Sequence, residues 1–246
     1  MKLSIFNKLL FILTLCACQN IDSKKESTII TSEQLYLNAA KMNSEENYDS
    51  ALVLLNQAFV KGLQNPMRIV SDSRFYNLID NPKHRQEVRV ILKKFASDNF
   101  TTIVREDEPG IRISVTGKVL NENTKRPIEN VIVKIVQADS SGIYFSENTT
   151  FNPRLFGYLK TDRNGQFTIH TIRPGSYLDD NGSPVPSHIH FTLEKSEFRT
   201  YASEFTFDDD LIFRANGNVD LVPVAIKKEN ANQTNYEVEL NMQSDQ

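Results

Sequence analysis

Apolar residues follow a helical period in the first part of the chain. Two segments share an apolar stripe at spacings of three and four residues: Ala51, Leu54, Leu55, Ala58 and Phe59 in the first, and Val88, Ile91, Leu92 and Phe95 in the second. This spacing places each set on one face of a helix that packs against a core. Gly62 and Pro66 follow the first stripe, and both residue types end helices. The pattern therefore predicts a small N-terminal α-helical domain over residues 33–100.

After Phe100 the chain changes to short β-branched and aromatic segments. Six of them are typical of strands and are separated by turn-forming Asn, Asp, Gly and Pro: 113–120, 131–138, 166–170, 188–194, 202–207 and 236–240. Residues 161–165, TDRNG, are expected to form a turn between two strands. This spacing predicts an all-β sandwich of two antiparallel sheets over residues 111–243.

The composition is that of a globular protein. The 39% hydrophobic content of the 246 residues is enough for a packed core. The formal net charge of -3 and the lack of a basic cluster argue against nucleic acid as the main partner.

The N-terminal segment does not belong to the predicted fold. Lys2 and Lys8 surround the start of an apolar run from residue 9 to residue 15, which is too short to span a bilayer and is typical of an export signal. The run ends in Leu-Cys-Ala-Cys, which resembles a bacterial lipobox. The resemblance implies a lipoprotein signal peptide over residues 1–17, lipidation of Cys18 and a polar tether over residues 18–32.

That interpretation leaves no cysteine pair for a disulfide, since Cys16 departs with the signal. Gln19 stands where an Asp favours retention in the inner membrane, so we expect an outer-membrane lipoprotein of the cell envelope, facing the periplasm or the exterior. An ordinary secretory signal is the alternative.

The helical segment YDSALVLLNQAFVKG with the following SDSRFYNLIDNPKHRQEV resembles a tetratricopeptide-type hairpin with its trailing helix. One copy is too few for a solenoid. The hairpin is either a docking surface for a protein partner or a spacer that packs on its neighbour.

Two of the four histidines stand one residue apart in PSHIHF, residues 186–191. Strand residues at i and i+2 point to the same face, with Cα atoms roughly 6–7 Å apart. One metal ion can therefore hold both His188 and His190.

The β segments resemble two families. VTGKVLNENTKRPIENVIVKI and LKTDRNGQFTIHTIRPGSY are similar both to the non-catalytic carboxypeptidase-regulatory or transthyretin-like module and to the intradiol ring-cleavage dioxygenases, which are built on a related sandwich. RPGSYLDDNGSPVPSHIHF and ADSSGIY separate the two, because they resemble the intradiol motifs Pro-Gly-X-Tyr, Pro-(Ala/Ser)-His-X-His-Phe and Asp-Ser-Ser-Gly-X-Tyr. The resemblance covers residues 113–210.

The intradiol resemblance implies a mononuclear ferric site with Tyr144, Tyr177, His188 and His190 as ligands. Tyr158 is an alternative to Tyr144. Fe(III) favours anionic oxygen, so two tyrosinates suit it. The resemblance also implies a catecholic substrate that dioxygen opens between its hydroxyl-bearing carbons to a cis,cis-muconate-type diacid, with Tyr177 as the catalytic residue that leaves the metal and takes a proton.

Two positions depart from the family pattern. Val185 stands where many members have an Arg, and we name Arg173 or Arg154 as residues that could compensate. Glu204 is the counterpart of a Gln that often flanks the family's pocket. The alternative hypotheses are a cell-surface module that keeps its site without turnover, and a structural transthyretin-like domain whose Tyr144, Tyr177, His188 and His190 would be dispersed.

Three further features are expected to lie outside the site. His84, beside Lys83 and Arg85, is expected to be solvated, and His170 to act on a strand face or behind the ligands. The acidic run at residues 208–210 is expected to be a solvated turn.

Overall fold

The structure, a computed structural model, describes residues 29–144, 152–215, 222–228 and 234–245. Residues Thr31–Gln246 form one compact unit. The expected signal peptide, Cys18 and most of the tether lie outside the described residues. Among the helices that the structure describes, none is long and apolar enough to cross a membrane.

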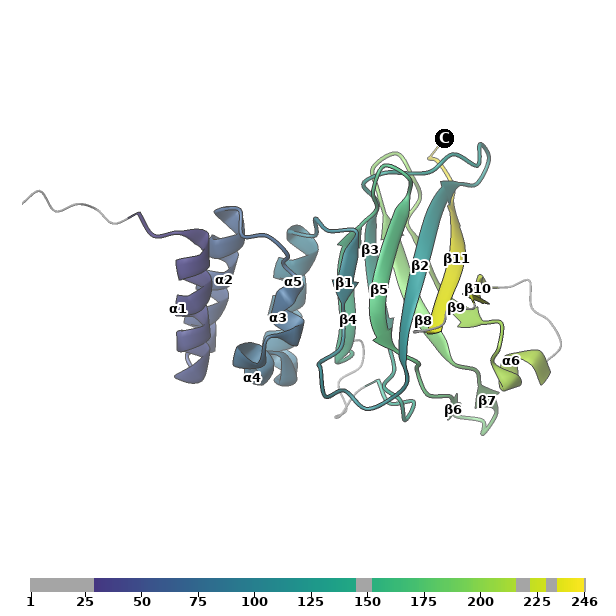
Figure 1. The fold of residues 1–246 in the computed structure, drawn as a ribbon, viewed down its shortest axis with the longest axis horizontal. Coiled ribbons are helices and arrows are strands. Elements are labelled where there is room, and N and C mark those ends of the chain that lie inside the picture. The colour runs from purple at the N-terminus through teal and green to yellow at the C-terminus, as the bar shows by residue number, and fades with distance from the viewer. Residues whose placement is uncertain (1–28, 145–151, 216–221, 229–233, 246) are drawn as a thin grey trace, which may run out of the picture. The chain divides into compact units, whose positions relative to one another are not determined.

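Two helices form an antiparallel hairpin at the start of this unit (Figure 1). α1 (Ser32–Ser44) begins where the Thr31 hydroxyl accepts the Gln34 N–H, and α2 (Tyr48–Val60) begins at the Asn47 cap. Gly62, with φ of +84°, follows α2 in a conformation that favours glycine. Its likeness to a tetratricopeptide repeat stays a prediction.

Short helical segments connect the hairpin to a third long helix. They are α3 (Arg68–Ser71), the 3-10 turn η1 (Ser73–Phe75) and α4 (Tyr76–Asp80), followed by α5 (Pro82–Lys94). His84 in α5 is buried rather than solvated, contrary to expectation. Its ring packs 4.6 Å from the ring of Tyr48, and its Nδ1 lies 3.2 Å from a Glu87 carboxylate oxygen. The helical pattern did not show that α2 covers this face of α5.

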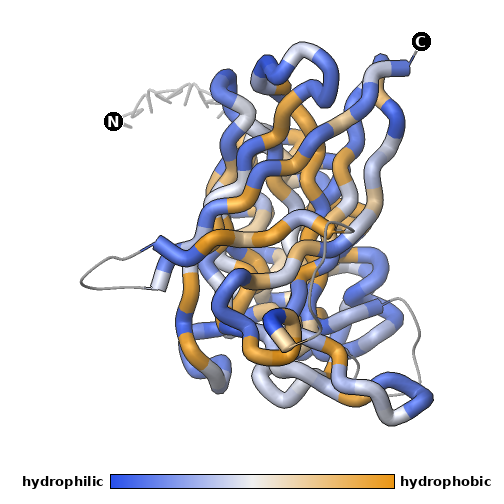
Figure 2. The backbone as a smooth tube through the Cα atoms, turned by 90° about the vertical axis from the view of Figure 1, so that its right-hand side faces the viewer, coloured by the Kyte–Doolittle hydropathy of each residue, from blue (hydrophilic) through white to orange (hydrophobic). Residues whose placement is uncertain are grey.

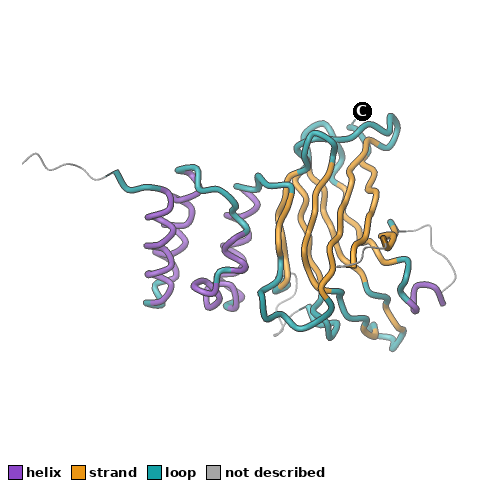
Figure 3. Tube along the Cα trace, in the orientation of Figure 1, coloured by secondary structure: helices purple, strands orange, loops and turns teal. Residues whose placement is uncertain are grey.

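Nine strands form one hydrogen-bonded sheet in the order β1-β5-β2-β11-β10-β9-β8-β3-β4. They are β1 (Phe100–Thr102), β2 (Arg112–Asn121), β3 (Ile132–Gln137), β4 (Leu155–Lys160), β5 (Gln166–Ile172), β8 (His188–Glu194), β9 (Tyr201–Phe207), β10 (Val224–Lys228) and β11 (Thr234–Met242). A small ribbon pairs β6 (Tyr177–Leu178) with β7 (Pro184–Val185), and α6 (Leu211–Ala215) follows β9. Figure 3 shows that helices dominate the first part of the unit and strands the second.

The β core with N-terminal helices confirms the predicted fold class. The expectation of two separate antiparallel sheets was wrong in detail. β10 pairs with β11 on one side and with β9 on the other, so it joins the two faces into one nearly closed sheet. The β1–β5, β9–β10 and β2–β11 pairs are parallel. The alternation of apolar residues identifies strands, but it does not specify their partners.

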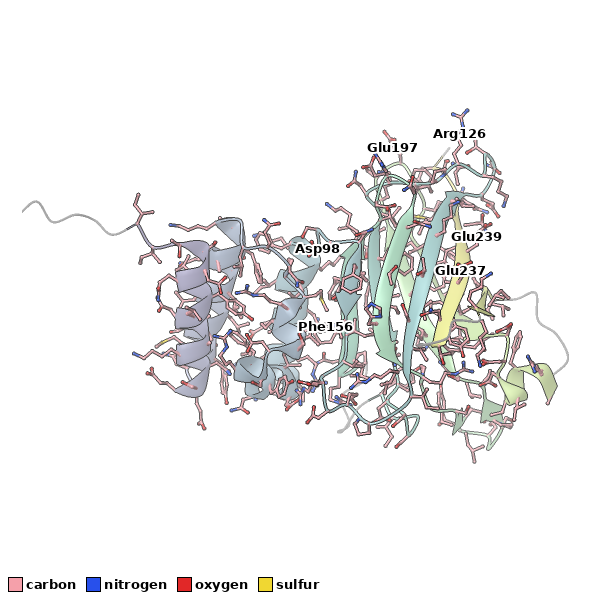
Figure 4. All side chains as sticks on the ribbon, in the orientation of Figure 1. Asp98, Arg126, Phe156, Glu197, Glu237 and Glu239 are labelled. Carbon is pink, nitrogen blue, oxygen red and sulfur yellow. The ribbon has the colours of Figure 1, made fainter. Side chains whose placement is uncertain are left out.

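The core lies between the two faces of this sheet. Hydrophobic and polar residues alternate along the strands (Figure 2), as in β11, where buried Tyr236, Val238 and Leu240 alternate with Glu237 and Glu239. Figure 4 labels these two glutamates along β11. Residues 161–165 turn between β4 and β5 as expected, with the Gly165 N–H bonded to the Asp162 carbonyl.

Arginines of α5 connect the helices to β4 and the residues before it. Arg85 is 1% exposed and donates to the carbonyls of Ile79, Asp80 and Asn152. Arg89 donates to the Tyr158 hydroxyl at 3.4 Å and lies 5.4 Å from the centre of the Phe156 ring, which Figure 4 labels beside the helices. This face of the sheet is therefore covered by cationic side chains.

Candidate metal centre

A tight turn after β3 places Tyr144. The Asp139 carboxylate accepts the N–H groups of Ser141 and Ile143, and Gly142 takes φ of +80°. The Asp139 N–H donates to the Ile143 carbonyl and the Gly142 N–H to the Asp139 carbonyl, which closes this Asp-Ser-Ser-Gly turn. Tyr144 is thus fixed by backbone geometry rather than by a strand.

The Pro-Gly-X-Tyr segment packs directly on this turn. The Gly175 N–H donates to the Asp139 carbonyl, and a Cβ at Gly175 would come within 2.5 Å of Gly142 N and the Ser140 carbonyl. Only glycine allows so close an approach of two backbones. As a result, Tyr177 starts β6 beside Tyr144, with ring centroids 6.0 Å apart at an interplanar angle of 87°.

Ser187 anchors the start of the histidine strand. Its N–H donates to Asp210 at 3.2 Å and its hydroxyl to the Pro174 carbonyl at 2.7 Å, while its carbonyl accepts the Thr206 hydroxyl. Arg173 Nε also donates to the Ser187 hydroxyl at 3.0 Å. Every polar group of this residue is bonded, so the position of His188 is tightly fixed.

The side chains of His188 and His190 converge on Tyr144. His188 is 3% exposed, and its Nδ1 lies 2.8 Å from the Pro186 carbonyl, which can only accept. Nδ1 therefore carries the proton and leaves a lone pair on Nε2. That Nε2 accepts the Tyr144 hydroxyl at 2.7 Å and lies 3.2 Å from His190 Nε2.

The distances within this tetrad, defined as Tyr144, Tyr177, His188 and His190, suit one metal ion. Two nitrogens each about 2.1 Å from an ion, at an angle of roughly 100°, lie about 3.2 Å apart. The observed separation of the two Nε2 atoms is 3.2 Å. Ring centroids within the tetrad lie 4.8 to 6.2 Å apart for the five measured pairs. The dispersed arrangement required by a purely structural domain is therefore contradicted.

The protonation states of the tetrad also fit a cation. Burial, together with Tyr177 and Glu204, raises the pKa of Tyr144, and burial followed by Glu204 raises the pKa of Tyr177. Phenolates therefore form here only with a compensating positive charge, which a metal ion supplies. Burial, then the neighbouring His188, lowers the pKa of His190, so its imidazole is neutral and able to bind a metal near pH 7.

Glu204 stands beside the two imidazoles. It lies opposite His190 in the register of β8 and β9, and its Oε2 is 3.5 Å from His190 Nδ1 and 3.9 Å from His188 Nε2. Each of the three residues offers one potential metal-ligand atom, and these atoms all lie within 4.8 Å of one another. Among the described residues, they are the one such cluster of His, Cys, Asp or Glu side chains. From the sequence, Glu204 was expected only as the counterpart of the Gln that often flanks the family's pocket.

The alternative tyrosine lies elsewhere. Tyr158 is buried on β4, opposite Lys134, and its hydroxyl bonds to Arg89. His170 packs edge-on against Phe100 at 4.8 Å on β5, which agrees with a strand-face role. In the described parts of the chain, the ring contacts of these two residues are with Phe100 and Phe156, outside the tetrad.

Both arginines named as substitutes for the one missing at Val185 have other partners. Arg154 makes a two-pronged ion pair with Glu108 at 2.6 and 2.8 Å. Arg173 bonds to Asp209, the Tyr236 hydroxyl and Ser187. Val185 itself pairs with Tyr177 in the β6–β7 ribbon.

The acidic run at residues 208–210 was expected to be a solvated turn, but its side chains are bonded within the protein. Asp209 pairs with Arg173, and Asp210 is 7% exposed and accepts the N–H groups of Ser187, Ile212 and Phe213. The run caps α6 and fixes the histidine strand. Sequence reasoning missed this role because the partners come from segments distant in the chain.

Comparisons with known proteins identify the family of the chain. The Dioxygenase_C family model, described as "Dioxygenase", matches residues 90–234. The protocatechuate 3,4-dioxygenase beta chain of Burkholderia cepacia is 37% identical over 99 residues, 37% of this chain and 42% of that protein. The protocatechuate 3,4-dioxygenase alpha chain of Pseudomonas putida is 27% identical over 117 residues, 46% of this chain and 51% of that protein. The chain spans about half the length of the curated relatives it matches.

A solved structure shares the fold. The catechol 1,2-dioxygenase of Pseudomonas arvilla C-1 aligns with a TM-score of 0.51 at 15% identity, over 88% of this chain and 79% of that chain. The family model covers more than half of the sequence, and its matched range includes all four residues of the tetrad. The chain belongs to the intradiol ring-cleavage dioxygenase family.

Proposed function

We propose that this chain cleaves catecholic aromatics between their hydroxyl-bearing carbons with dioxygen, at a mononuclear ferric site. The observation that carries the proposal is the convergence of two phenols and two imidazoles from three separate segments. Family membership supports the reaction class. The donor set supports ferric iron, because hard trivalent cations favour anionic oxygen with imidazole nitrogen.

The tetrad would hold the ferric ion, which would supply a Lewis acid and a template for both catechol oxygens. Tyr177 is partly exposed, and as a tyrosinate it would offer its Oη as the acceptor for a catechol proton. Glu204 offers a second proton acceptor beside His190. His188 is held in its orientation by the Pro186 carbonyl at its Nδ1.

The ferric-loaded protein is expected to consume dioxygen with catechol and to form a ring-opened diacid in equal amounts. Oxygen uptake followed together with product absorbance and mass checks this stoichiometry. Protein that retains iron but consumes no oxygen over a panel of catechols would instead favour a metal-binding module without turnover. Two observations favour that second candidate. Val185 occupies the position of the family's Arg, and both Arg173 and Arg154 are paired with carboxylates, with Asp209 and Glu108 respectively.

We also propose that the protein is held outside the cytoplasm by a lipid on Cys18. Support comes from the apolar run and the Leu-Cys-Ala-Cys sequence. Cys18→Ser should move the protein from the membrane fraction to the soluble fraction, whereas Cys16→Ser should leave it membrane-bound. An unchanged distribution of the Cys18 variant contradicts the anchor.

A further inference from the structure

Glu204 brings a third kind of donor to the two histidines of the tetrad. It lies opposite His190 in the register of the neighbouring strands β8 and β9, so the two side chains stand on the same face of the sheet. Its Oε2 lies 3.5 Å from His190 Nδ1 and 3.9 Å from His188 Nε2. A carboxylate oxygen therefore stands beside both imidazoles.

The Glu204 carboxylate has no cationic side chain bonded to it. Among the described residues it makes no hydrogen bond and no ion pair with Lys or Arg, and its side chain is only 36% exposed. Facing it, His188 presents the lone pair of Nε2, since Nδ1 donates to the Pro186 carbonyl. Both facing atoms are rich in electrons, so a cation between them is favoured.

The separations of these donor atoms suit a metal ion. Two donors that each lie about 2.1 Å from one ion are no more than about 4.2 Å apart. The distance between the two histidine Nε2 atoms is 3.2 Å, and both distances to Glu204 Oε2 are also below this limit. His190 turns Nε2 to His188 and Nδ1 to Glu204, so a rotation of the partly exposed Glu204 side chain completes the set.

Charge decides which ion such a group holds. A carboxylate ordinarily carries its charge near pH 7, whereas a phenol, with an ordinary pKa near 10, gives up its proton only beside a strongly charged ion. Two imidazoles with one carboxylate are a common donor set for divalent zinc and iron. A trivalent ion with two phenolates and a divalent ion with one carboxylate both leave one positive charge.

We propose that His188, His190 and Glu204 form a second metal site, for a divalent cation of the zinc and cobalt class, which shares its imidazoles with the tetrad. We name these three residues the carboxylate triad. The inference goes beyond the proposed function, because it requires neither a phenolate nor turnover. The divalent and ferric ions exclude each other, since both need His188 Nε2. The metal that the chain carries then depends on the supply of the two ions.

Titration of the metal-free full chain with Co²⁺ tests the triad, because the visible absorption of Co²⁺ reports its ligands. The wild-type protein should bind one Co²⁺ per chain, and Zn²⁺ should displace it. Glu204→Gln keeps the size of the side chain but removes its charge. Loss of a partner that merely orients a ligand costs 10- to 100-fold in metal affinity, so this variant should weaken Co²⁺ by about 100-fold or more. Its ferric charge-transfer band should persist.

Two further variants make the test specific. Tyr144→Phe should give the converse result, a weakened ferric band with Co²⁺ affinity unchanged or higher, because the variant frees His188 Nε2 from a hydrogen bond. Glu239→Gln, at an exposed position on β11, is the matched control and should bind both ions like the wild-type protein. Prior loading of the wild-type protein with Zn²⁺ should prevent the ferric band.

The outcomes separate the triad from the ferric site. Co²⁺ affinity in Glu204→Gln equal to that of the wild-type protein would overturn the triad. So would an equal loss of both ions in that variant, which would show that Glu204 only orients His190, or a loss of Co²⁺ in Tyr144→Phe. Wild-type protein that binds Co²⁺ but takes up no ferric iron would instead overturn the proposed function and leave the triad in place.

Discussion

His188→Ala is expected to abolish retention of ferric iron. The variant removes the most buried donor of the tetrad and also the acceptor of the Tyr144 hydroxyl. Loss of a partner that merely orients a ligand already weakens metal affinity 10- to 100-fold, so loss of the ligand should weaken it by more than about 100-fold. Iron per chain, measured by elemental analysis after desalting, checks this result.

His170→Ala is the matched control for this variant. It removes an imidazole from β5, where the ring packs on Phe100 and has no measured contact with the tetrad. Its iron content should equal that of the wild-type protein. Full iron retention by His188→Ala would show that the metal is held elsewhere, whereas loss in both variants would point to general destabilisation.

Arg173→Met is expected to lower both stability and iron affinity. The guanidinium bonds to Ser187, Asp209 and the Tyr236 hydroxyl and lies 3.9 Å from the centre of the Phe207 ring. Its loss leaves Asp209 without this partner and costs about 2–3 kcal/mol of the free energy of unfolding. Ser187 directly precedes His188 at the start of β8, so the variant also makes the position of His188 less fixed. Iron affinity should therefore fall roughly 10-fold or more.

Arg85→Met separates these two effects. Arg85 is a buried arginine of α5 that donates to the carbonyls of Ile79, Asp80 and Asn152, so the variant also lowers stability, and these three partners lie outside the tetrad. Urea unfolding and ferric titration of both variants give the comparison. Iron affinity that falls equally in the two variants would contradict a positioning role for Arg173.

The sequence predicted those parts of the fold that have a clear period. β3, β5, β8 and β11 largely alternate between buried and more exposed positions, whereas β2 and β9 each contain a run of three buried residues and were identified by their β-branched and aromatic residues. β4 was missed because it lacks this alternation. Residues 155–159 are all buried, since Arg89 and its neighbours on α5 cover the outer face of the strand. β1 is only three residues long. The closure by β10 depends on pairing between distant segments, which no local pattern encodes.

The tetrad was predictable because its motifs include the turns that place it. Asp139, Gly142 and Gly175 fix the backbones that carry Tyr144 and Tyr177, so the motif contains its own geometry. Glu204 had no such signal. Its position beside the histidines depends on the register of β9 against β8. The same limitation applied to Asp210, whose partners lie in other segments.

The visible absorption spectrum of the ferric-loaded protein tests the central claim most directly. Coordination by two tyrosinates predicts a broad charge-transfer band that weakens in Tyr144→Phe, is unchanged in Tyr158→Phe, and shifts when catechol is added without oxygen. A protein that binds ferric iron but stays colourless, or whose band is the same in Tyr144→Phe, would contradict a site built on these phenols.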